Sequence, residues 1–495
     1  MAVSGQEVGL HSSPREYCGV FGVHAADEDA ARVAFYGLYA LQHRGQESAG
    51  IVTADGHELH SYLGMGLVSQ VFDEEDLRHL RGHIAIGHNR YSTTGSSRLK
   101  NAQPFRVSGP NGEIALGHNG NLVNAETLRA DMEEEGHEFT TTTDSEVMAR
   151  ILAFAPGHSW SQRFAHMMRR VQGAYSLVVL TPDALFAVRD PLGVRPLCLG
   201  RLNGGWVVAS ESCAFDHLGA GFLREVDPGE VIQITARGVR SFRPMESNRS
   251  AFCVFEYIYF ARPDSVIRSK LLYPVRMAMG ARLAREYPID ADVVMGVPDS
   301  AIAAAIGYSQ ESGIPFVEGL VKNRYVGRTF IMPDQRIREV GVQLKFNPLP
   351  EILRGKSVVV VDDSIVRGTT TPRVVEMLRR AGAREVHMRI TAPPITHPCF
   401  FGVDMAARWE LIAAQKTVPE IREHIGADSL GYLSLEGLVE AVGLPQDTFC
   451  LACFTGSYPL AVPLQMDKLA LEAPPAARDR HDFEWAESVP TPSSS

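Results

Sequence analysis

Two adjacent aspartates and the hydroxyl-rich turn after them have the residue types and spacing that best indicate a binding site in this chain. Asp362 and Asp363 follow the valine run 358–361, and the turn SIVRGTT at 364–370 follows them, with Gly368 at its bend. Backbone N–H groups and hydroxyls at the start of a helix bind phosphate, because the donors converge there and the helix dipole favours an anion. Two carboxylates beside them suit a hard cation or a pair of sugar hydroxyls. An ordinary strand-to-helix turn with acidic capping is the alternative interpretation.

A buried strand and an amphipathic helix must position this turn. Four consecutive valines bounded by Gly355 predict a strand that is buried on both faces, and Pro372 at the first helical position predicts the helix that follows. The same alternation of strand with helix or loop recurs at 291–313, 313–320 and 384–394. Repeated units of this kind predict a parallel sheet with helices on both faces, with ligands at the carboxyl ends of its strands.

Polar motifs in the first half of the chain lie between short apolar segments, as loops at strand ends do. Cys18 opens the segment CGVFG, and downstream lie HRGQESAG at 43–50, GHNRYSTTG at 87–95, HNGNL at 118–122 and TTTDSEV at 141–147. Loops rich in Asn, Arg, Asp and Gly are where binding and catalytic sites are built. Cys18 could be a nucleophile among them, or a buried structural thiol. The runs SLVVLT, LFAVRD, WVVAS and EVIQIT predict short strands, which fit two stacked sheets with outer helices.

Length and composition limit the classes of protein to which this chain can belong. The chain has 495 residues, 45% hydrophobic and 21% charged, which predicts two or three globular domains. A net charge of −10 without a basic stripe argues against nucleic-acid binding, which requires clustered Lys and Arg. No apolar run is long enough to span a bilayer, and residues 1–17 lack the apolar core of a signal peptide. We therefore expect a cytoplasmic protein that binds neither nucleic acid nor membrane.

Seven cysteines are spread over the chain, an odd number that argues against structural disulfides. Cys198 and Cys213 lie in apolar surroundings and are expected to be core thiols. Cys450 and Cys453 form a CxxC pair, for which zinc, redox chemistry and chance all stay open. Together with Cys253 and Cys399 they would supply four thiols, which suit either zinc or an iron–sulfur cluster.

Two families resemble the two parts of the chain. Residues 18–243 resemble the glutaminase domain of class II glutamine amidotransferases through CGVFG, LQHRGQESAGI, GHNRYSTTG, ALGHNGNLVN and TTTDSEV. The run VDDSIVRGTT resembles the motif with which type I phosphoribosyltransferases bind phosphoribosyl diphosphate (PRPP). With FCVFEYIYFARPD and VKNRYVGRTFI, the combination resembles the glutamine PRPP amidotransferase family from Cys18 to Tyr458.

The resemblance implies an α+β and α/β architecture. An αββα four-layer domain of the N-terminal-nucleophile hydrolase type would precede a parallel-sheet type I phosphoribosyltransferase domain. The implied divisions are a leader removed on maturation (1–17), the glutaminase domain (18–245), the phosphoribosyltransferase domain (246–466) and a disordered tail (467–495).

The resemblance also implies an enzyme that makes 5-phosphoribosylamine, glutamate and pyrophosphate, the first step of purine synthesis. Cys18 would become the mature N-terminus, and its α-amino group, with a pKa of ~7.7 to 8.0, could take the thiol proton. The remaining implied glutaminase residues are Asn119 and Gly120 for the oxyanion hole, Arg90 and Asp144 for the α-carboxylate and α-ammonium of glutamine, and the loop with Arg44 and Gly45. From residue type alone, Arg90 could instead form a surface ion pair, and Asp144 could cap a helix.

For the second half the resemblance implies a site for PRPP and Mg²⁺. Ser300, Asp362 and Asp363 would contact the magnesium ion. Lys322, Arg324 and Arg328 would close over the pyrophosphate, although three cations are also typical of a solvated face. The 5-phosphate would be wrapped by Ser364, Ile365, Val366, Arg367, Gly368, Thr369 and Thr370.

The branch of this family with a leader carries a [4Fe-4S] cluster. Its ligands would be Cys253, Cys399, Cys450 and Cys453, in a structural or oxygen-sensing role. Many such relatives have a further cysteine just before the last pair, where this chain has none. A homotetramer and feedback inhibition by purine nucleotides are also implied.

Two other functions would use parts of the same pattern. A regulator can bind PRPP without turning it over, but it would have no use for Cys18 with Arg90, Asn119 and Asp144. The same glutaminase can also be joined to a sugar-phosphate isomerase or to a synthetase, and VDDSIVRGTT argues against that.

Overall fold

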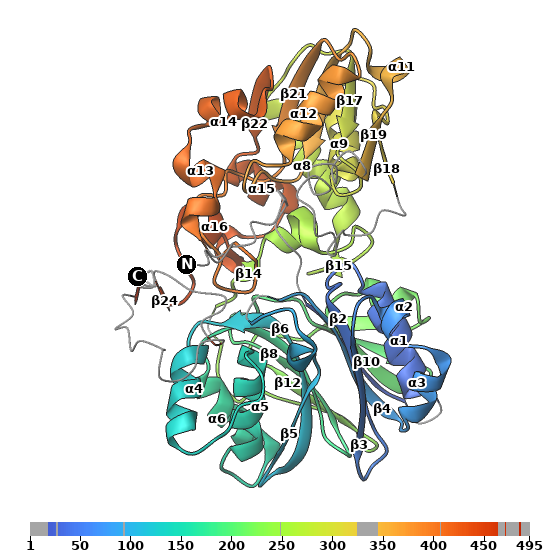
Figure 1. Ribbon diagram of the computed structural model, residues 1–495, viewed down its shortest axis with the longest axis vertical. Helices are drawn as coiled ribbons and strands as arrows, with labels where there is room; N and C mark the ends of the chain where they lie inside the picture. The colour runs from blue at the N-terminus through green and yellow to red at the C-terminus, as the bar shows by residue number, and fades with distance from the viewer. Residues whose placement is uncertain are drawn as a thin grey trace, which may run out of the picture.

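The computed structural model describes residues 18–25, 28–92, 95–247, 249–323, 345–405, 407–463, 471 and 485–486. The described chain forms two halves, the first drawn from blue to green and the second from yellow-green to red (Figure 1). The first half ends with β13 (Gly238–Phe242), and the second begins with β14 (Phe252–Cys253). No described helix is both long and apolar enough to cross a bilayer.

Two antiparallel sheets form the centre of the first half. The seven-stranded sheet has the order β11 (Gly221–Glu225), β9 (Cys198–Leu202), β10 (Gly205–Ala209), β1 (Gly19–His24), β4 (Ile84–Arg90), β2 (Ser48–Ala54) and β3 (Leu59–Met65). The six-stranded sheet has the order β13, β12 (Val231–Thr235), β8 (Leu185–Arg189), β7 (Gly173–Leu180), β6 (Gly112–Leu122) and β5 (Phe105–Gly109). Val20 and Ile86 of one sheet pack against Val178 and Ala187 of the other.

Helices cover the outer faces of both sheets (Figure 1). Side chains alternate between the two faces of a strand. In β1, Val20 faces the other sheet, whereas Phe21 and Val23 face the helices on the outer side. The seven-stranded sheet is covered by α1 (Ala30–Ala40), α2 (Val68–Val71), α3 (Glu74–His79) and α7 (Cys213–Asp216), and the six-stranded sheet by α4 (Ala125–Glu134), α5 (Asp144–Phe154) and α6 (Trp160–Arg170). The predicted four layers, αββα, are confirmed.

A parallel sheet forms the centre of the second half, as predicted. Its order is β17 (Val293–Gly296), β20 (Ser357–Asp362), β21 (Glu385–Ile390) and β22 (Ser429–Tyr432). Val359 and Val361 of β20 pack toward α8 (Leu272–Glu286), α9 (Ile302–Ser312) and α15 (Leu435–Val442). Val358 and Val360 pack toward α11 (Pro350–Leu353), α12 (Thr371–Arg380) and α14 (Val418–Ile425). The valine run is apolar throughout because both of its faces are buried.

Two local predictions need correction. Helix α12 begins at Thr371, so Pro372 occupies its second position. The segment 313–320 does not form a full strand, because only Phe316 bridges to Val294 before β18 (Leu320–Lys322) begins. Pro315 lacks the N–H that a ladder needs, which keeps this segment from pairing further.

Short elements complete the described chain. The strand pairs are β14 with β23 (Phe449–Cys450), β15 (Val266–Ile267) with β16 (Lys270–Leu271), β18 with β19 (Phe346–Pro348), and β24 (Val462–Pro463) with β25 (Trp485–Ala486). A π-helical turn spans Glu256–Phe260, and two short helices are α13 (Ile412–Gln415) and α16 (Ala452–Thr455). The leader 1–17, Arg324 and Arg328 lie outside the described residues, as does the predicted disordered tail apart from Leu471 and β25.

Helices α8 and α9 approach each other through two glycines. A Cβ at Gly280 would lie 1.8 Å from the carbonyl oxygen of Ala304, and a Cβ at Gly307 would lie 1.9 Å from that of Met277. The backbones are therefore in direct contact on this face of the parallel sheet. Any side chain at either position would force the two helices apart.

We expect Gly307→Ala to destabilise the protein, although alanine is intrinsically the better helix former by about 1 kcal/mol. Overpacking of this kind costs about 1–3 kcal/mol, so the thermal unfolding midpoint should fall. Gln310→Ala, at an exposed position of the same helix, is the control and should not lower it. An unchanged midpoint for Gly307→Ala would contradict the close contact of α8 with α9.

Candidate active sites

Cys18 lies immediately before β1, in a small cavity of the first half. Its side chain is 6% exposed, and its thiol donates a hydrogen bond to the carbonyl oxygen of Tyr91 at 3.3 Å. The cavity has about 10 Å³ of space for the centre of a water molecule. Its lining consists of Cys18, Arg90, Tyr91, Gln103, His118, Gly120, Thr143, Asp144 and Ser145. Four of the predicted glutaminase residues therefore meet at one cavity.

The buried thiol of Cys18 holds its proton at neutral pH. Burial raises the pKa of Cys18 to about 11, although the hydrogen bond to Tyr91 and the positive charge of Arg90 act in the opposite direction. The thiolate is the nucleophilic form of cysteine. Cys18 therefore needs a nearby base before it can attack a substrate.

Asn119 and Gly120 lie near the end of β6, beside this cavity. Asn119 is fully buried, and neither its Nδ2 nor its Oδ1 has a hydrogen-bond partner in the protein. A buried amide without a partner is costly, so this side chain is suited to bind a ligand. Gly120 has φ +152°, and a Cβ there would lie 1.9 Å from the carbonyl oxygen of Ala174. Glycine is therefore required next to the amide.

Arg90 and Asp144 place opposite charges at the cavity. Arg90 is buried and lies 3.6 Å from Glu47. Burial would raise the pKa of Asp144, but the neighbouring His118 and the N–H of Leu122, at 3.0 Å, lower it below its usual value. Asp144 is therefore ionised. A cation and an anion at one cavity match the α-carboxylate and α-ammonium of an amino acid.

The alternative role of Asp144 as a helix cap does not fit the structure. The cap of α5 is Thr143, whose hydroxyl oxygen accepts a hydrogen bond from the N–H of Glu146. Asp144 is already the first residue of the helix. Its carboxylate accepts from the N–H of Leu122 instead, which aims it toward the end of β6.

The paired aspartates lie at the carboxyl end of β20. Asp363 accepts hydrogen bonds from the hydroxyls of Ser300 and Ser364, both at 2.6 Å. Burial raises the pKa of both aspartates, and the charge of Asp363 adds to the effect on Asp362. Two adjacent carboxylates that are hard to ionise together fit a cation, because its charge would offset both. The three predicted magnesium ligands are thus brought together from two segments.

The turn after these aspartates leads into α12. Gly368 has φ +67°, and a Cβ there would lie 2.4 Å from Ile412 Cδ1. The hydroxyls of Thr369 and Thr371 are buried without a partner in the protein. Donors of this kind beside the start of a ten-residue helix suit an anion. Arg367, by contrast, forms an ion pair with Glu410 at 2.6 Å.

Lys322 is the one predicted pyrophosphate residue in the described chain, because Arg324 and Arg328 lie in the gap 324–344. It ends β18 and forms an ion pair with Asp299, one residue before Ser300. Its ammonium group is therefore close to the predicted magnesium ligands.

Four cysteines of the second half gather from three segments. Cys253 and Cys450 are paired in register between the parallel strands β14 and β23. Burial raises the pKa of Cys450, and the nearby thiols of Cys253 and Cys399 raise it further. Burial also raises the pKa of Cys453, and the other three thiols add to the shift. All four thiols are free, and Cys198 and Cys213 are buried in the first half, as predicted.

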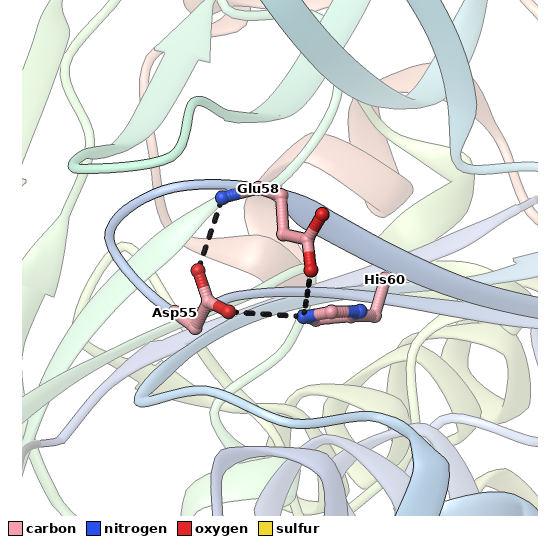
Figure 2. Close-up of side chains that lie close together, drawn as sticks. All are labelled: Asp55, Glu58 and His60. Carbon is pink, nitrogen blue, oxygen red and sulfur yellow. Dashed lines mark hydrogen bonds and ion pairs between the residues drawn. The ribbon is translucent and has the colours of Figure 1, made fainter.

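A further group of possible metal ligands consists of Asp55 and Glu58, in the turn between β2 and β3, and His60 of β3 (Figure 2). His60 Nε2 lies 3.2 Å from Asp55 and 3.8 Å from Glu58, and Asp55 accepts the N–H of Glu58 at 3.0 Å. The carboxylate of Glu58 is largely exposed. These contacts close the hairpin turn, and none of the predicted site residues belongs to the group.

Comparisons with known proteins agree with both halves. A glutamine amidotransferase domain family matches residues 88–217, and a phosphoribosyl transferase domain family matches residues 274–396. The amidophosphoribosyltransferase of Synechococcus elongatus is 52% identical over 467 residues, which cover 93% of this chain and 95% of the relative. That of Archaeoglobus fulgidus is 53% identical over 451 residues, which cover 90% and 98%.

The chain belongs to the amidophosphoribosyltransferase family.

Solved structures also resemble this amidophosphoribosyltransferase chain. A glutamine PRPP amidotransferase from B. subtilis, complexed with ADP and GMP, has a TM-score of 0.84 at 48% identity and covers 89% of this chain. A structure described as the allosteric regulatory enzyme of purine biosynthesis has a TM-score of 0.85 at the same identity. The chain is therefore an enzyme that joins a glutamine amidotransferase to a phosphoribosyltransferase. Neither alternative function, the regulator nor the isomerase or synthetase fusion, fits these relatives.

Arg44, predicted as a glutamine-binding residue, is buried between the two halves of the amidophosphoribosyltransferase. Its guanidinium contacts Glu211 at 2.5 Å and Glu256 of the π-helical turn at 2.8 Å, and its Nε donates to the carbonyl oxygen of Cys18 at 3.2 Å. Arg195 lies 3.6 Å from Glu256. Arg44 therefore holds the backbone of Cys18 in place. A Cβ at Gly45 would lie 2.6 Å from the carbonyl group of Asn89, so the chain packs closely there too.

The sequence did not reveal Glu211, Glu256 or Arg195. Their partners lie far away in the chain, for example 212 residues between Arg44 and Glu256. The one available signal was charge inside otherwise apolar runs, as in FCVFEY, which is costly unless it is paired.

We expect Glu211→Gln to reduce stability at pH 7 by about 3 kcal/mol, because it leaves the buried Arg44 partly uncompensated. Burial would raise the pKa of Glu211, but His43 and Arg44 lower it far below its ordinary value of 4.5. A lowered pKa stabilises the fold above the unfolded pKa, and the contribution is lost on acidification. The difference from the wild type should therefore shrink below about pH 4.5.

Denaturation midpoints at several pH values would measure this effect. Glu376→Gln removes one partner of the exposed pair with Arg380 and serves as the control, with an expected change of less than about 1 kcal/mol. A Glu211→Gln midpoint that matches the wild type at pH 7 would contradict the assigned network.

Proposed function

We propose that this amidophosphoribosyltransferase hydrolyses glutamine at Cys18 and transfers the ammonia to PRPP bound at Asp362–Thr370. The observation that carries the proposal is the cavity at which Cys18, Arg90, Gly120 and Asp144 meet. We assign residues 18–245 to the glutaminase domain and 246–466 to the phosphoribosyltransferase domain. The products are 5-phosphoribosylamine, glutamate and pyrophosphate.

Removal of residues 1–17 would supply the base that Cys18 needs. The thiol, whose pKa is raised by burial to about 11, cannot ionise unaided at pH 7. A free α-amino group on the same residue has a pKa of ~7.7 to 8.0 and can accept the thiol proton within one residue. Attack on the glutamine amide then gives a thioester and ammonia, and water releases glutamate from the thioester.

The remaining groups at the cavity fit glutamine and its transition state. Arg90 pairs with the α-carboxylate and Asp144 with the α-ammonium. The unpartnered amide of Asn119 and the N–H of Gly120 donate to the oxyanion of the tetrahedral intermediate. Arg44 and Gly45 act indirectly, because the contacts of Arg44 fix the backbone of Cys18.

PRPP fits the end of β20 in the second half. The turn Ser364–Thr370 binds the 5-phosphate, and Lys322 closes over the pyrophosphate together with Arg324 and Arg328. Ser300, Asp362 and Asp363 hold Mg²⁺, which supplies positive charge for the leaving pyrophosphate when bound. The raised pKa of both aspartates supports this assignment, because a cation would offset their charges.

A [4Fe-4S] cluster fits Cys253, Cys399, Cys450 and Cys453. The four thiols come from three segments, and Cys253 and Cys450 are paired in register between β14 and β23. Burial and the neighbouring thiols raise the pKa of Cys450 and of Cys453, and a bound cation would offset the charge of the thiolates. When bound, such a cluster would cross-link three segments of the second half.

We infer the regulation and assembly of this enzyme from its relatives. The B. subtilis amidotransferase binds ADP and GMP, so we infer that purine nucleotides inhibit this enzyme too. We also infer a cytoplasmic homotetramer.

Cys18→Ala should abolish glutamine-dependent synthesis of phosphoribosylamine, by more than about 10³-fold, because no other group replaces the thiolate. Synthesis from free ammonia should persist, since the second half is untouched. Product assays with glutamine and with ammonia, run side by side, measure both. Cys198→Ala, in the core of the first half, is the control and should retain both activities. Loss of both in Cys18→Ala would show that the two sites are not separable as proposed.

Protein purified without oxygen should be brown and contain about four iron and about four sulfide per chain. Cys453→Ser should lose most of this iron, because it removes one of the ligands, while the matched Cys213→Ser should keep it. Iron, zinc and acid-labile sulfide are quantified on the same samples. An active, colourless protein loaded with zinc would overturn the cluster assignment.

A further inference from the structure

A loop of the second half, residues 399–405, lies against the glutaminase site of the first. Asn121 Nδ2 donates a hydrogen bond to the carbonyl oxygen of Phe400 at 3.0 Å. Arg195 donates to the carbonyl oxygen of Phe401 through Nε at 3.0 Å and Nη2 at 2.6 Å. The loop is thus fixed to the first half by hydrogen bonds to two consecutive peptide groups.

The loop is also held from within its own half. The N–H of Cys399 donates to the carbonyl oxygen of Met405 at 3.0 Å, which closes the loop. Phe400 and Phe401 are both buried, and each packs against the ring of Tyr458. A closed loop with buried side chains has little freedom to shift.

Gly402, at the centre of this loop, touches the backbone of Gly120. A Cβ at Gly402 would lie 3.0 Å from both the carbonyl carbon and the oxygen of Gly120, and 3.2 Å from its Cα. On the strand side, the Cα of Gly120 approaches Ala174 of β7 so closely that a Cβ would lie 1.9 Å from the carbonyl oxygen. Gly120 is therefore confined by contacts from both halves of the protein.

We propose that Gly402 is a positioning residue for glutamine hydrolysis, and that the second half thereby completes the oxyanion hole of the first. The proposal rests on the assignment of Asn119 and Gly120 as oxyanion donors. Such donors act only when they are fixed in advance, within about 0.5 Å of the position where charge develops. Contact with Gly402 fixes the Cα and carbonyl group of Gly120, and so the residue that carries the donor N–H, whereas a side chain at position 402 would displace this residue.

A purely conformational need for glycine is the competing explanation, because Gly402 has φ +102°. Gly56 separates the two explanations. It has φ +100°, and a Cβ there would meet nothing within 4 Å. Gly56→Ala therefore places alanine at a similar positive φ without the contact, and is the matched control.

Gly402→Ala should lower kcat for glutamine hydrolysis by about tenfold or more, since the complete loss of one oxyanion donor costs about 10² to 10³. KM for glutamine should change little, because the added methyl group would meet Gly120, whereas Arg90 and Asp144 are the residues assigned to bind the α-carboxylate and α-ammonium. Ammonia-dependent synthesis should be retained, which shows that the protein is folded. Gly56→Ala should match the wild type in all three measurements.

A pair of inhibitors tests the oxyanion hole itself. Glutamate γ-semialdehyde adds the Cys18 thiol across its carbonyl group: the S–C bond forms, and the thiol proton ends on the oxygen, which lies in the hole. Glutamate makes the same contacts at its α-carbon, but its planar γ-carboxylate forms no adduct with the thiol. Gly402→Ala should weaken the aldehyde by about tenfold and leave glutamate unchanged, since only the aldehyde presents a tetrahedral oxygen. Equal weakening of both inhibitors would overturn the proposal.

Two more variants keep the test decisive. Asn119→Ala reports on the underlying site: if it keeps full glutaminase activity, the assigned oxyanion hole is wrong, whereas a loss there with normal Gly402→Ala kinetics overturns only the role of Gly402. Should Gly402→Ala fail to fold, Asn121→Ala removes the hydrogen bond to Phe400 without adding volume. It should lower glutamine-dependent kcat by about threefold, with ammonia-dependent synthesis retained, as expected for one net hydrogen bond. Unchanged kinetics in Asn121→Ala would count against the proposal.

Discussion

The rest of this structure depends on four charges buried where the two halves meet. Arg44 lies between Glu211 and Glu256, and Arg195 lies beside Glu256, all almost completely excluded from solvent. Charges in such a position are tolerated only when each has its counter-charge, because desolvation of an unpaired ion costs several kcal/mol. Three of these residues belong to the first half and Glu256 to the second. Separation of the halves would expose or unpair them, so the network favours a single relative placement.

That placement matters because the backbone of Cys18, the proposed nucleophile, is part of it. Arg44 donates to the carbonyl oxygen of Cys18, so the network holds the backbone that carries the thiol. Arg195 contacts both Glu256 and the carbonyl oxygen of Phe401, which links the network to the loop that touches Gly120. The positions of the Cys18 thiol and of Gly120, the proposed oxyanion donor, are therefore set by the same junction, although the two residues come from different segments of the chain.

Local patterns in the sequence were sufficient to predict the central strands and the candidate site residues. The valine run predicted β20 correctly, because a strand that is buried on both faces needs no information from elsewhere in the chain. The motifs that contain Cys18, Arg90, Asn119 and Asp144 predicted these residues as candidates for the glutaminase site. Arg44 could not be placed, because its contacts depend on Glu256, 212 residues away. Gly402 gave no signal for the same reason: only the folded chain shows that its missing side chain makes room for Gly120.

The two candidate sites differ from the junction in how their polar groups are satisfied. At the junction, the assigned charges are matched within the protein, as a structural role requires. At the sites, the amide of Asn119 and the hydroxyls of Thr369 and Thr371 are buried without protein partners, and the adjacent carboxylates of Asp362 and Asp363 oppose each other's ionisation. Such groups reduce the stability of the free protein, and a substrate that satisfies them recovers that free energy on binding. The distinction separates residues such as Arg44, whose charges are paired within the protein, from residues such as Asn119, which we propose bind a substrate.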